Sequence, residues 1–343
     1  MGILIGLIVV GLVALVGGAE LIVRFGSRLA RRLRISSMVI GLTIVSIGTS
    51  LPELAVGIEG ARRGAASLVV GNIVGSNIVN ILLVLGLAAL LKPIVVDTPL
   101  VRFDLPVMVG VSVAVLVLGL LGWLAVGTGA VLFFLGIAYL VVLLVTARRR
   151  AASEDIAAVT GSIPVVSPDG TLTEGEMPGD HGEFKPGVLY LLADVALVIA
   201  GLAVIVFGAD WLIQGATGIA EAMGVSETII GLTVVAFGTS VPELATTVMA
   251  SIRGDEGIAV GNVVGSCTMN LTLILGGSLL FSGHGGAALD PSLIFVNLPI
   301  MVVVSLLTLV TCLMGRRMTR ANGALFMLLY SGYLAYLITT AAV

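Results

Sequence analysis

The sequence predicts an all-α integral membrane protein with ten transmembrane helices, arranged as two inverted five-helix repeats in which helices 2 and 7 are broken. Three observations lead to this fold class: an apolar composition, ten apolar stretches of membrane-spanning length, and one segment that occurs twice. Of the 343 residues, 58% are hydrophobic and only 11% are charged, which excludes a soluble globular protein.

The ten apolar stretches are each long enough to cross a bilayer, which takes about 20 residues as a helix. The first has no basic segment before it and no small-residue cleavage site, so we expect no removable signal peptide. The predicted spans are residues 3–26, 37–60, 67–90, 105–125, 128–147, 188–213, 227–251, 257–282, 293–314 and 323–342.

Basic residues lie almost entirely in alternate loops. The loops after spans 1, 3, 5, 7 and 9 hold 14 Lys and Arg residues, whereas the opposite side holds only Arg62 and Arg63. The positive-inside rule therefore predicts a multi-pass protein of the cell's inner (plasma) membrane with both termini on the non-cytoplasmic side. Membrane lipid is its expected surrounding, and nothing in the sequence points to nucleic acid or to an obligate protein partner.

A polar stretch separates two halves of five spans each. Residues 151–185 are rich in Gly, Pro, Ser and acidic side chains, a composition typical of a linker. We expect a first repeat at 1–147, a cytoplasmic linker loop at 148–187 and a second repeat at 188–343. A tether is the simpler role for the linker, and ion sensing by its acids is the alternative. Because five spans is an odd number, the second half must enter the membrane from the opposite side, as in many transporters.

The duplicated segment carries the chemistry. GLTIVSIGTSLPELA at 41–55 returns as GLTVVAFGTSVPELA at 231–245, and GNIVGSNIVN at 71–80 returns as GNVVGSCTMN at 261–270. Each copy places a glutamate, Glu53 or Glu243, inside an apolar span, where an unpaired charge is expensive. A carboxylate retained twice in the same register indicates function.

The first motif predicts a polar stripe on a broken helix. Ser46, Thr49, Ser50 and Glu53 recur at helical spacing and therefore share one face. Pro52 and Pro242 have no amide hydrogen, so a carbonyl one turn earlier loses its helical donor and needs a polar environment. The alternative is a proline kink whose hydroxyls bond back to their own helix.

The second motif adds a stripe of amide and hydroxyl groups. Asn72, Ser76 and Asn80 lie at i, i+4 and i+8, and Asn262, Ser266 and Asn270 repeat this spacing. The glycines of the same motif also form GxxxG pairs, whose ordinary role is close helix packing. We expect both roles.

Two glutamates among neutral oxygens predict a divalent cation site. Ca²⁺ binds six to eight oxygens, and two ionised carboxylates balance its charge. Without a cation, repulsion and desolvation make both charges costly, so monovalent cations or protons must replace the divalent ion. Glu20 and Asp210 are expected to anchor their helices or line vestibules, with a role in the ion path as the alternative. Asp194 is expected near the cytoplasmic interface, and Cys267 and Cys312 lie in spans, so no disulfide framework is predicted.

GTSLPELA with GNIVGSNIVN, together with their second copies, resemble the α-repeats of the Ca²⁺/cation antiporter superfamily, most closely its prokaryotic sodium/calcium exchanger branch. The resemblance covers nearly the whole chain. It implies a transporter rather than an enzyme, with no cofactor, with Ca²⁺ and Na⁺ as substrates, and with alternating access by sliding of the first and sixth helices.

By position, the resemblance implies ion ligands in both copies, with backbone carbonyls contributed at Ser46 and Ala236. These residues are Ser46, Thr49, Ser50, Glu53, Ser76, Asn80, Ala236, Thr239, Ser240, Glu243, Ser266 and Asn270. Two departures from the family pattern stand out. Asn270 replaces an aspartate that is associated with a potassium requirement, which suggests potassium independence. Cys267 stands where the first copy has Asn77.

Four functions are compatible with these residues. The first is an antiporter that moves Ca²⁺ outward against inward Na⁺. The second is an antiporter of the same superfamily coupled to H⁺ or specific for another divalent ion. A cation channel could also use rings of carboxylates and hydroxyls, but two inverted repeats favour alternating access. An intramembrane enzyme with two acids would leave the hydroxyl and amide stripes without a purpose.

Overall fold

The computed structural model describes residues 2–62, 64–160, 188–223, 236–282 and 289–341. Within them, eight helices are long and apolar enough to cross a membrane, and a ninth span is added if the bent pair Ser37–Thr49 and Leu51–Arg62 counts as one. The predicted seventh span, 227–251, begins outside the described residues. The prediction of an all-helical membrane fold is therefore confirmed for the described part of the chain.

The first half of the chain consists of helices, several of which contain a short π-helical segment, written η. Its elements are α1 (Gly2–Leu33), α2 (Ser37–Ile40), η1 (Gly41–Val45), α3 (Ser46–Thr49), α4 (Leu51–Arg62), α5 (Ala66–Val79), η2 (Asn80–Leu85), α6 (Gly86–Leu91), the strand β1 (Ile94–Val95), η3 (Leu100–Asp104), α7 (Leu105–Leu120) and α8 (Val126–Thr160).

The second half repeats much of this order. Its described elements are α9 (Val188–Ala222), α11 (Ala236–Gly238), α12 (Val241–Arg253), α13 (Glu256–Met269), η5 (Asn270–Ile274), α14 (Leu275–Leu280), η6 (Leu293–Asn297), α15 (Leu298–Gly315), the strand β2 (Arg317–Met318) and α16 (Arg320–Ala341).

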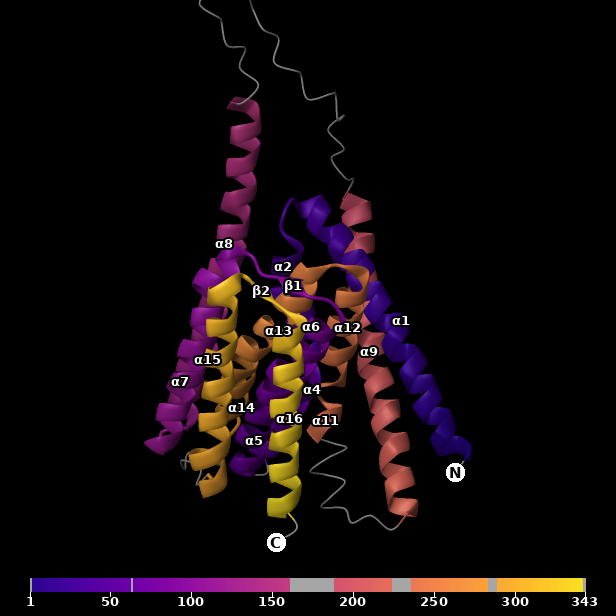
Figure 1. Cartoon of the computed structure of the whole chain (residues 1–343), viewed down its shortest axis with the longest axis vertical. Helices are drawn as coiled ribbons and strands as arrows, with labels where there is room; N and C mark the ends of the chain where they lie inside the picture. The colour runs from indigo at the N-terminus through magenta and orange to yellow at the C-terminus, as the bar shows by residue number, and fades with distance from the viewer. Residues whose placement is uncertain (1, 63, 161–187, 224–235, 283–288, 342–343) are drawn as a thin grey trace, which may run out of the picture.

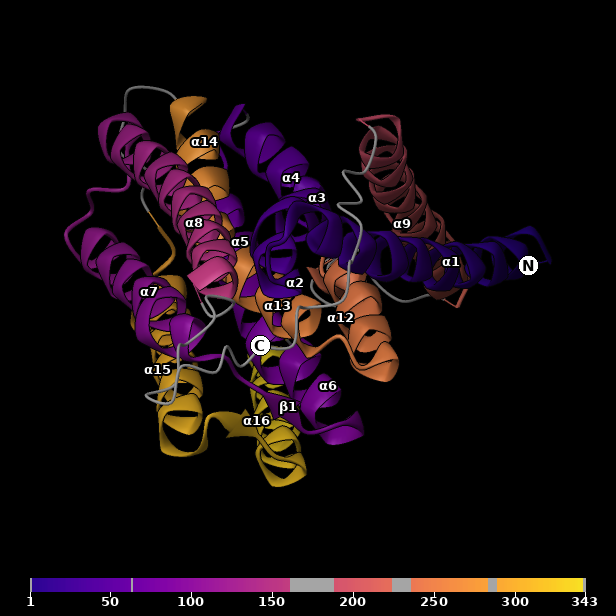
Figure 2. The ribbon, with the colours of Figure 1, turned by 90° about the horizontal axis from the view of Figure 1, so that it is seen from above.

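The two helices that carry the second motif, α5 and α13, lie at the centre of the bundle. Figure 2 shows α5 and α13 in the middle, with α1, α9, α8, α7, α15 and α16 towards the outside. The span formed by α13 and α14 is almost wholly buried, whereas most of α16 is exposed. In Figure 1 the beginning of α1 and the end of α16 lie at the same end of the bundle, opposite β1 and β2.

Two helices end later than the sequence suggests. The first extends to Leu33 rather than stopping near residue 26, because the helix continues through a basic last turn that contains Arg31 and Arg32. The expected irregular linker from residue 151 is wrong at its start, since α8 continues to Thr160. The segment AASEDIAA contains good helix formers, which propagate an existing helix. The rest of the linker, 161–187, lies outside the described residues, as does the start of the seventh predicted span.

The π-helical segments fall at corresponding places in the two halves. One begins at Asn80 and one at Asn270, 190 positions apart. Two others, η3 and η6, end one residue before the sequences LPVM and LPIM. A proline ring clashes with the carbonyl four residues before it, and a widened turn relieves that clash. Because this occurs in both halves, it indicates a shared design rather than local irregularity.

The α1 and α9 helices pack against each other through glycines at seven-residue spacing. A Cβ atom added at Gly11 would lie 2.7 Å from the Gly208 carbonyl oxygen, and one at Gly18 would lie 2.8 Å from the Gly201 carbonyl oxygen. The helices therefore run antiparallel with their backbones in contact. Beyond this contact, Asp194 of α9 pairs with Arg28 and Arg32 of α1, at 3.6 Å and 2.9 Å.

Contacts between the halves extend beyond the duplicated segment. The hydroxyls of Ser112 in α7 and Ser305 in α15 lie 3.4 Å apart and share a hydrogen bond. The antiparallel strands β1 and β2 pair Ile94 with Met318 and Val95 with Arg317. These contacts hold the two halves together around the central helices.

The packing of α1 on α9 predicts that alanine substitution of two adjacent glycines, Gly18 and Gly17, affects stability differently. Gly18→Ala should lower the free energy of unfolding by about 1–3 kcal/mol, because the new methyl group meets backbone and Ile205. Gly17→Ala is the matched control: nothing lies within 4 Å of its added Cβ, so the helix should be unchanged or up to about 1 kcal/mol more stable. Thermal unfolding of both variants in detergent measures the difference, and equal melting temperatures would contradict the packing.

Candidate functional site

The first copy of the motif forms a broken helix. Segments Ser37–Thr49 and Leu51–Arg62 meet at an angle of 45°. At the break, Ser50 has φ −86° and ψ 10°, outside the helical region. Pro52 lies in the first turn of α4, where a backbone N–H has no acceptor within the helix. The N–H that proline lacks therefore costs α4 no hydrogen bond. The predicted break is therefore confirmed in the first copy.

The second copy has the same local geometry. Ser240 adopts φ −89° and ψ 2°, close to the values of Ser50, and Pro242 again lies in the first turn of the following helix, α12. Helix α11 ends at Gly238 and α12 begins at Val241, so the interruption falls at the corresponding residues. The same sequence has produced the same break twice.

Each copy packs against the other half of the chain. A Cβ added at Gly41 would lie 2.9 Å from the Ile258 carbonyl oxygen, and one at Gly261 would lie 2.5 Å from that of Met38. The backbones of η1 and α13 therefore touch. On the opposite side, α11 packs against α5. Glycine allows these close approaches, as the sequence predicted for the second GxxxG pair.

Both motif glutamates are fully buried at this junction. Glu53 and Glu243 are each 0% exposed. Ser50 donates a hydrogen bond to Glu243 Oε1 at 3.0 Å, so a hydroxyl of one copy meets the carboxylate of the other. Ser76 donates to Glu53 Oε1 at 3.3 Å, and Thr239 of the second copy also hydrogen-bonds to Glu53. The two carboxylates are near enough to repel each other.

Several buried polar atoms around these carboxylates have no hydrogen-bond partner. They include one oxygen of each carboxylate, Oε2 of Glu53 and of Glu243. The others from the two motifs are Asn72 Nδ2, Asn80 Nδ2 and Oδ1, Ser240 Oγ, Ser266 Oγ and Asn270 Oδ1. Buried polar groups in proteins are nearly always paired, and the oxygens among these atoms suit a cation, whereas the two amide nitrogens can only donate hydrogen bonds. The donor set, carboxylate plus hydroxyl and amide oxygens, is that of a hard cation.

Eleven of the twelve sequence-predicted residues are buried. They are Ser46, Thr49, Ser50, Glu53, Ser76, Asn80, Thr239, Ser240, Glu243, Ser266 and Asn270. Ala236 is the first residue of α11. The Ser46 carbonyl accepts hydrogen bonds from the Ser50 amide at 3.1 Å and from Thr49 Oγ1 at 3.4 Å.

Asn262 and Thr247 belong to the same network although sequence reasoning did not include them among the ligands. Thr49 donates to Asn262 Oδ1 at 3.2 Å, and Asn262 Nδ2 donates to Thr247 Oγ1 at 3.0 Å and to the Glu243 carbonyl at 3.4 Å. Asn262 thus links the two copies. Thr247 lies four residues after Glu243, the spacing that could have identified it. Asn72, the counterpart of Asn262, is only partly buried.

The other membrane acids lie elsewhere. Glu20 pairs with Arg253 at 2.6 Å, Asp210 is exposed and accepts from Gln214 at 2.7 Å, and Asp194 bonds to arginines of α1. Each therefore has a basic or amide partner of its own. Glu20 thus joins α1 to the end of α12, as expected of an anchoring residue, whereas the Asp210 contact lies within α9. A polar hollow of about 980 Å³ lies beside Glu20 and Arg253, between α1 and the turn that joins α12 to α13.

Comparison with known proteins identifies related chains along almost the entire length. The sodium/calcium exchanger protein family model matches residues 3–145 and 194–339. Inner membrane protein YrbG of Escherichia coli is 34% identical, with 96% of this chain and 94% of that protein covered. Sodium/calcium exchanger MaX1 of Methanosarcina acetivorans is 32% identical, with coverage of 96% and 97%. A solved structure of the sodium-calcium exchanger NCX_Mj superposes with a TM-score of 0.78 at 32% identity, covering 98% of this chain and 99% of that one.

The Asn262 network predicts unequal consequences for the two equivalent asparagines. Asn262→Leu should lower the free energy of unfolding by at least about 2 kcal/mol, because Thr49, Thr247 and the Glu243 carbonyl each lose a buried partner. Asn72→Leu should cost less than about 1 kcal/mol, since its Nδ2 has no partner to lose. Thermal unfolding compares them, and a larger loss for Asn72→Leu would refute the assignment.

Proposed function

The chain belongs to the sodium/calcium exchanger family, and from that premise we propose that it exchanges Ca²⁺ for Na⁺ across the membrane by alternating access. The family consists of ion transporters rather than enzymes, and Na⁺ and Ca²⁺ are the ions that it transports. The observation that carries the proposal is the burial of Glu53 and Glu243 where the two copies touch, each bonded to a hydroxyl of the other copy and each with one carboxylate oxygen that has no partner.

A divalent ion fits this site because it balances the local charge. Two ionised carboxylates carry two negative charges, and the surrounding hydroxyl and amide oxygens add none. At a separation of 4 Å and an effective dielectric constant near 20, two like charges repel by about 4 kcal/mol. A Ca²⁺ ion between them converts this repulsion into attraction and provides a partner for each free oxygen.

Exchange follows from the same electrostatics. When the divalent ion leaves, the buried charges are again uncompensated, and the conformational change that carries an empty site across the membrane becomes unfavourable. Na⁺ ions in the same cage restore the balance. We place the transported ions among the twelve residues that the resemblance implies, with Glu53 and Glu243 supplying the charge and Ser46 and Ala236 supplying carbonyls. Since Asn270 is neutral, we propose exchange that is independent of potassium.

The architecture that we propose is ten membrane helices in two inverted five-helix repeats, residues 1–147 and 188–343, joined by a cytoplasmic linker at 148–187. The same break at Ser50 and Ser240, and the return of π-helical segments at corresponding positions, support it. The chain would be a multi-pass protein of the inner membrane with both termini outside the cytoplasm. The placement of the first and last helix ends on one side of the bundle is consistent with this (Figure 1).

Transport in sealed vesicles tests the proposed function. Purified protein is reconstituted, the vesicles are loaded with Na⁺, K⁺ or buffer of low pH, and calcium-45 uptake is measured after dilution. We expect uptake only with the outward Na⁺ gradient. Uptake driven by the proton gradient alone would assign a proton-coupled antiporter instead, and rapid equilibration without any gradient would indicate a channel.

Neutralising either motif glutamate should abolish divalent uptake. Glu53→Gln and Glu243→Gln keep the side-chain volume, but each removes one of the two negative charges that would bind the ion. We therefore expect uptake to fall at least about 100-fold. Asp210→Asn is the matched control, because Asp210 is exposed and hydrogen-bonds to Gln214. Uptake is compared in vesicles with equal amounts of folded protein. Normal uptake in both glutamine variants would remove these carboxylates from the site.

A further inference from the structure

Asn77 holds a neighbouring residue of the proposed site although it is not among the implied ligands. It lies in α5 and is 1% exposed. Its Nδ2 donates to the Cys267 carbonyl at 3.1 Å and contacts Met301 Sδ at 3.8 Å. Its Oδ1 accepts a hydrogen bond from Asn270 Nδ2, also at 3.1 Å. Asn77 therefore joins α5 to α13 and to Asn270, one of the twelve proposed ligands.

The chemistry of these partners fixes which way each amide faces. A backbone carbonyl can only accept, so Asn77 must present its NH₂ group to Cys267. Its oxygen then faces Asn270, which must donate its own NH₂ group. The Asn270 oxygen, Oδ1, then points away from Asn77 and is buried without a partner. The chain of hydrogen bonds thus commits Asn270 to act as an oxygen ligand rather than as a donor.

The corresponding position in the other repeat cannot do the same. Residue 267 is the counterpart of Asn77, and residue 80 is the counterpart of Asn270, both at an offset of 190. Cys267 contacts the Asn77 carbonyl through its thiol at 3.9 Å, which mirrors the amide contact in the opposite direction. A thiol has one weak donor and is a weak acceptor, so it has little with which to hold an amide.

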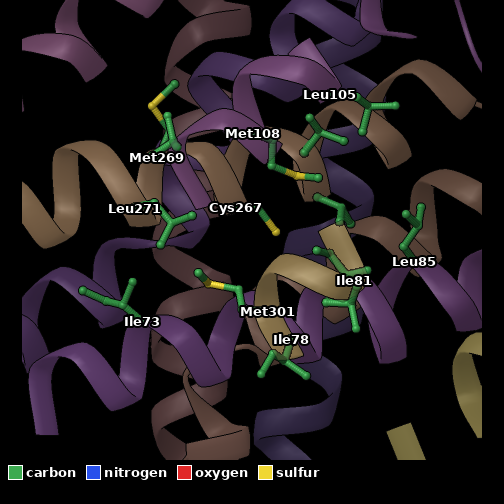
Figure 3. Packing of buried hydrophobic residues seen from close by; sticks show 14 of the residues in the cluster. Ile73, Ile78, Ile81, Leu85, Leu105, Met108, Cys267, Met269, Leu271 and Met301 are labelled. Atoms are coloured by element: carbon green, nitrogen blue, oxygen red, sulfur yellow. The ribbon is translucent and has the colours of Figure 1, made fainter. Parts of the chain in front are cut away.

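Asn80 accordingly lacks an anchor. Both its Nδ2 and its Oδ1 are buried without a partner in the described structure. Figure 3 shows Cys267 within the apolar cluster that contains Met108 and Met301, the methionines of the LPVM and LPIM sequences.

We propose that Asn77 is a positioning residue that fixes the Asn270 oxygen towards the transported cation, and that Cys267 leaves Asn80 as an unanchored, weaker ligand. This inference rests on the proposed function. Residues that hydrogen-bond to the ligands of an ion generally affect its affinity, because a ligand side chain that rotates freely must be ordered on binding. The two halves of the cage are therefore unequal, one rigid and one adjustable.

Three variants test the proposal, each compared with the wild-type chain. Asn77→Leu keeps the volume but removes the anchor, Cys267→Asn supplies the missing anchor to Asn80, and the double variant Asn77→Cys with Cys267→Asn moves the single anchor from Asn270 to Asn80. Two quantities are measured: Ca²⁺ binding by titration calorimetry in detergent, and the half-saturating Ca²⁺ concentration and maximal rate of uptake in vesicles. Thermal unfolding without Ca²⁺ monitors folding.

We expect Asn77→Leu to weaken Ca²⁺ binding by about 10-fold or more, the usual effect of removing a ligand's orienting partner. Cys267→Asn should strengthen binding, and the double variant should bind more tightly than Asn77→Leu alone. A merely structural role for Asn77 would lower the melting temperature but would not be rescued by the exchange of the two residues.

The outcomes separate this proposal from the proposed function. Unchanged Ca²⁺ affinity in Asn77→Leu, or no rescue in the double variant, overturns the anchor while leaving Ca²⁺ exchange intact. Proton-driven rather than Na⁺-driven uptake overturns the counter-ion assignment, and the affinity series still decides the anchor. A wild-type chain that binds no Ca²⁺ overturns both.

Discussion

The structure depends on the cost of burying two carboxylates together among apolar helices long enough to span a membrane. Glu53 and Glu243 are fully buried, close enough to repel, and each has an oxygen that no protein group satisfies. In water such a pair would be unremarkable, but at low dielectric each uncompensated charge costs several kcal/mol. A fold that keeps this arrangement must obtain compensation from something that comes and goes, which is the physical basis of ion exchange.

The helix breaks deliver the polar groups to that point. A continuous helix would satisfy its own backbone. At the first break the Ser50 hydroxyl instead bonds to Glu243 of the other copy, and beside the second break Thr239 hydrogen-bonds to Glu53. Because the second copy faces the first, each glutamate is held by a hydroxyl of the other repeat. The site is therefore incomplete within either half, and neither half is expected to bind a divalent ion alone.

Central and outer helices contact their neighbours in two different ways. The central helices interlock through hydrogen bonds such as Asn77 to Asn270 and Thr49 to Asn262, which require fixed geometry. In contrast, α1 and α9 meet through glycine backbones with few directional contacts beyond the Asp194 ion pairs at one end. Glycine lets these two outer helices pack backbone to backbone.

The sequence by itself determined the membrane class, the duplicated motifs and the residues that gather at the centre. Each of these follows from a pattern along the chain: the length of the apolar stretches, a repeat in constant register, and a carboxylate within an apolar span. The break at the proline-containing motif was likewise predictable, because proline removes a donor regardless of context.

Only the tertiary structure decided which groups face one another. Ser50 bonding to Glu243, Asn262 linking Thr49 to Thr247, and Asn77 orienting Asn270 join residues far apart in the chain, and periodicity within one helix says nothing about its neighbour. The contrast between anchored Asn270 and unanchored Asn80 depends on Cys267, a single substitution whose effect appears only when the two repeats are brought together in space.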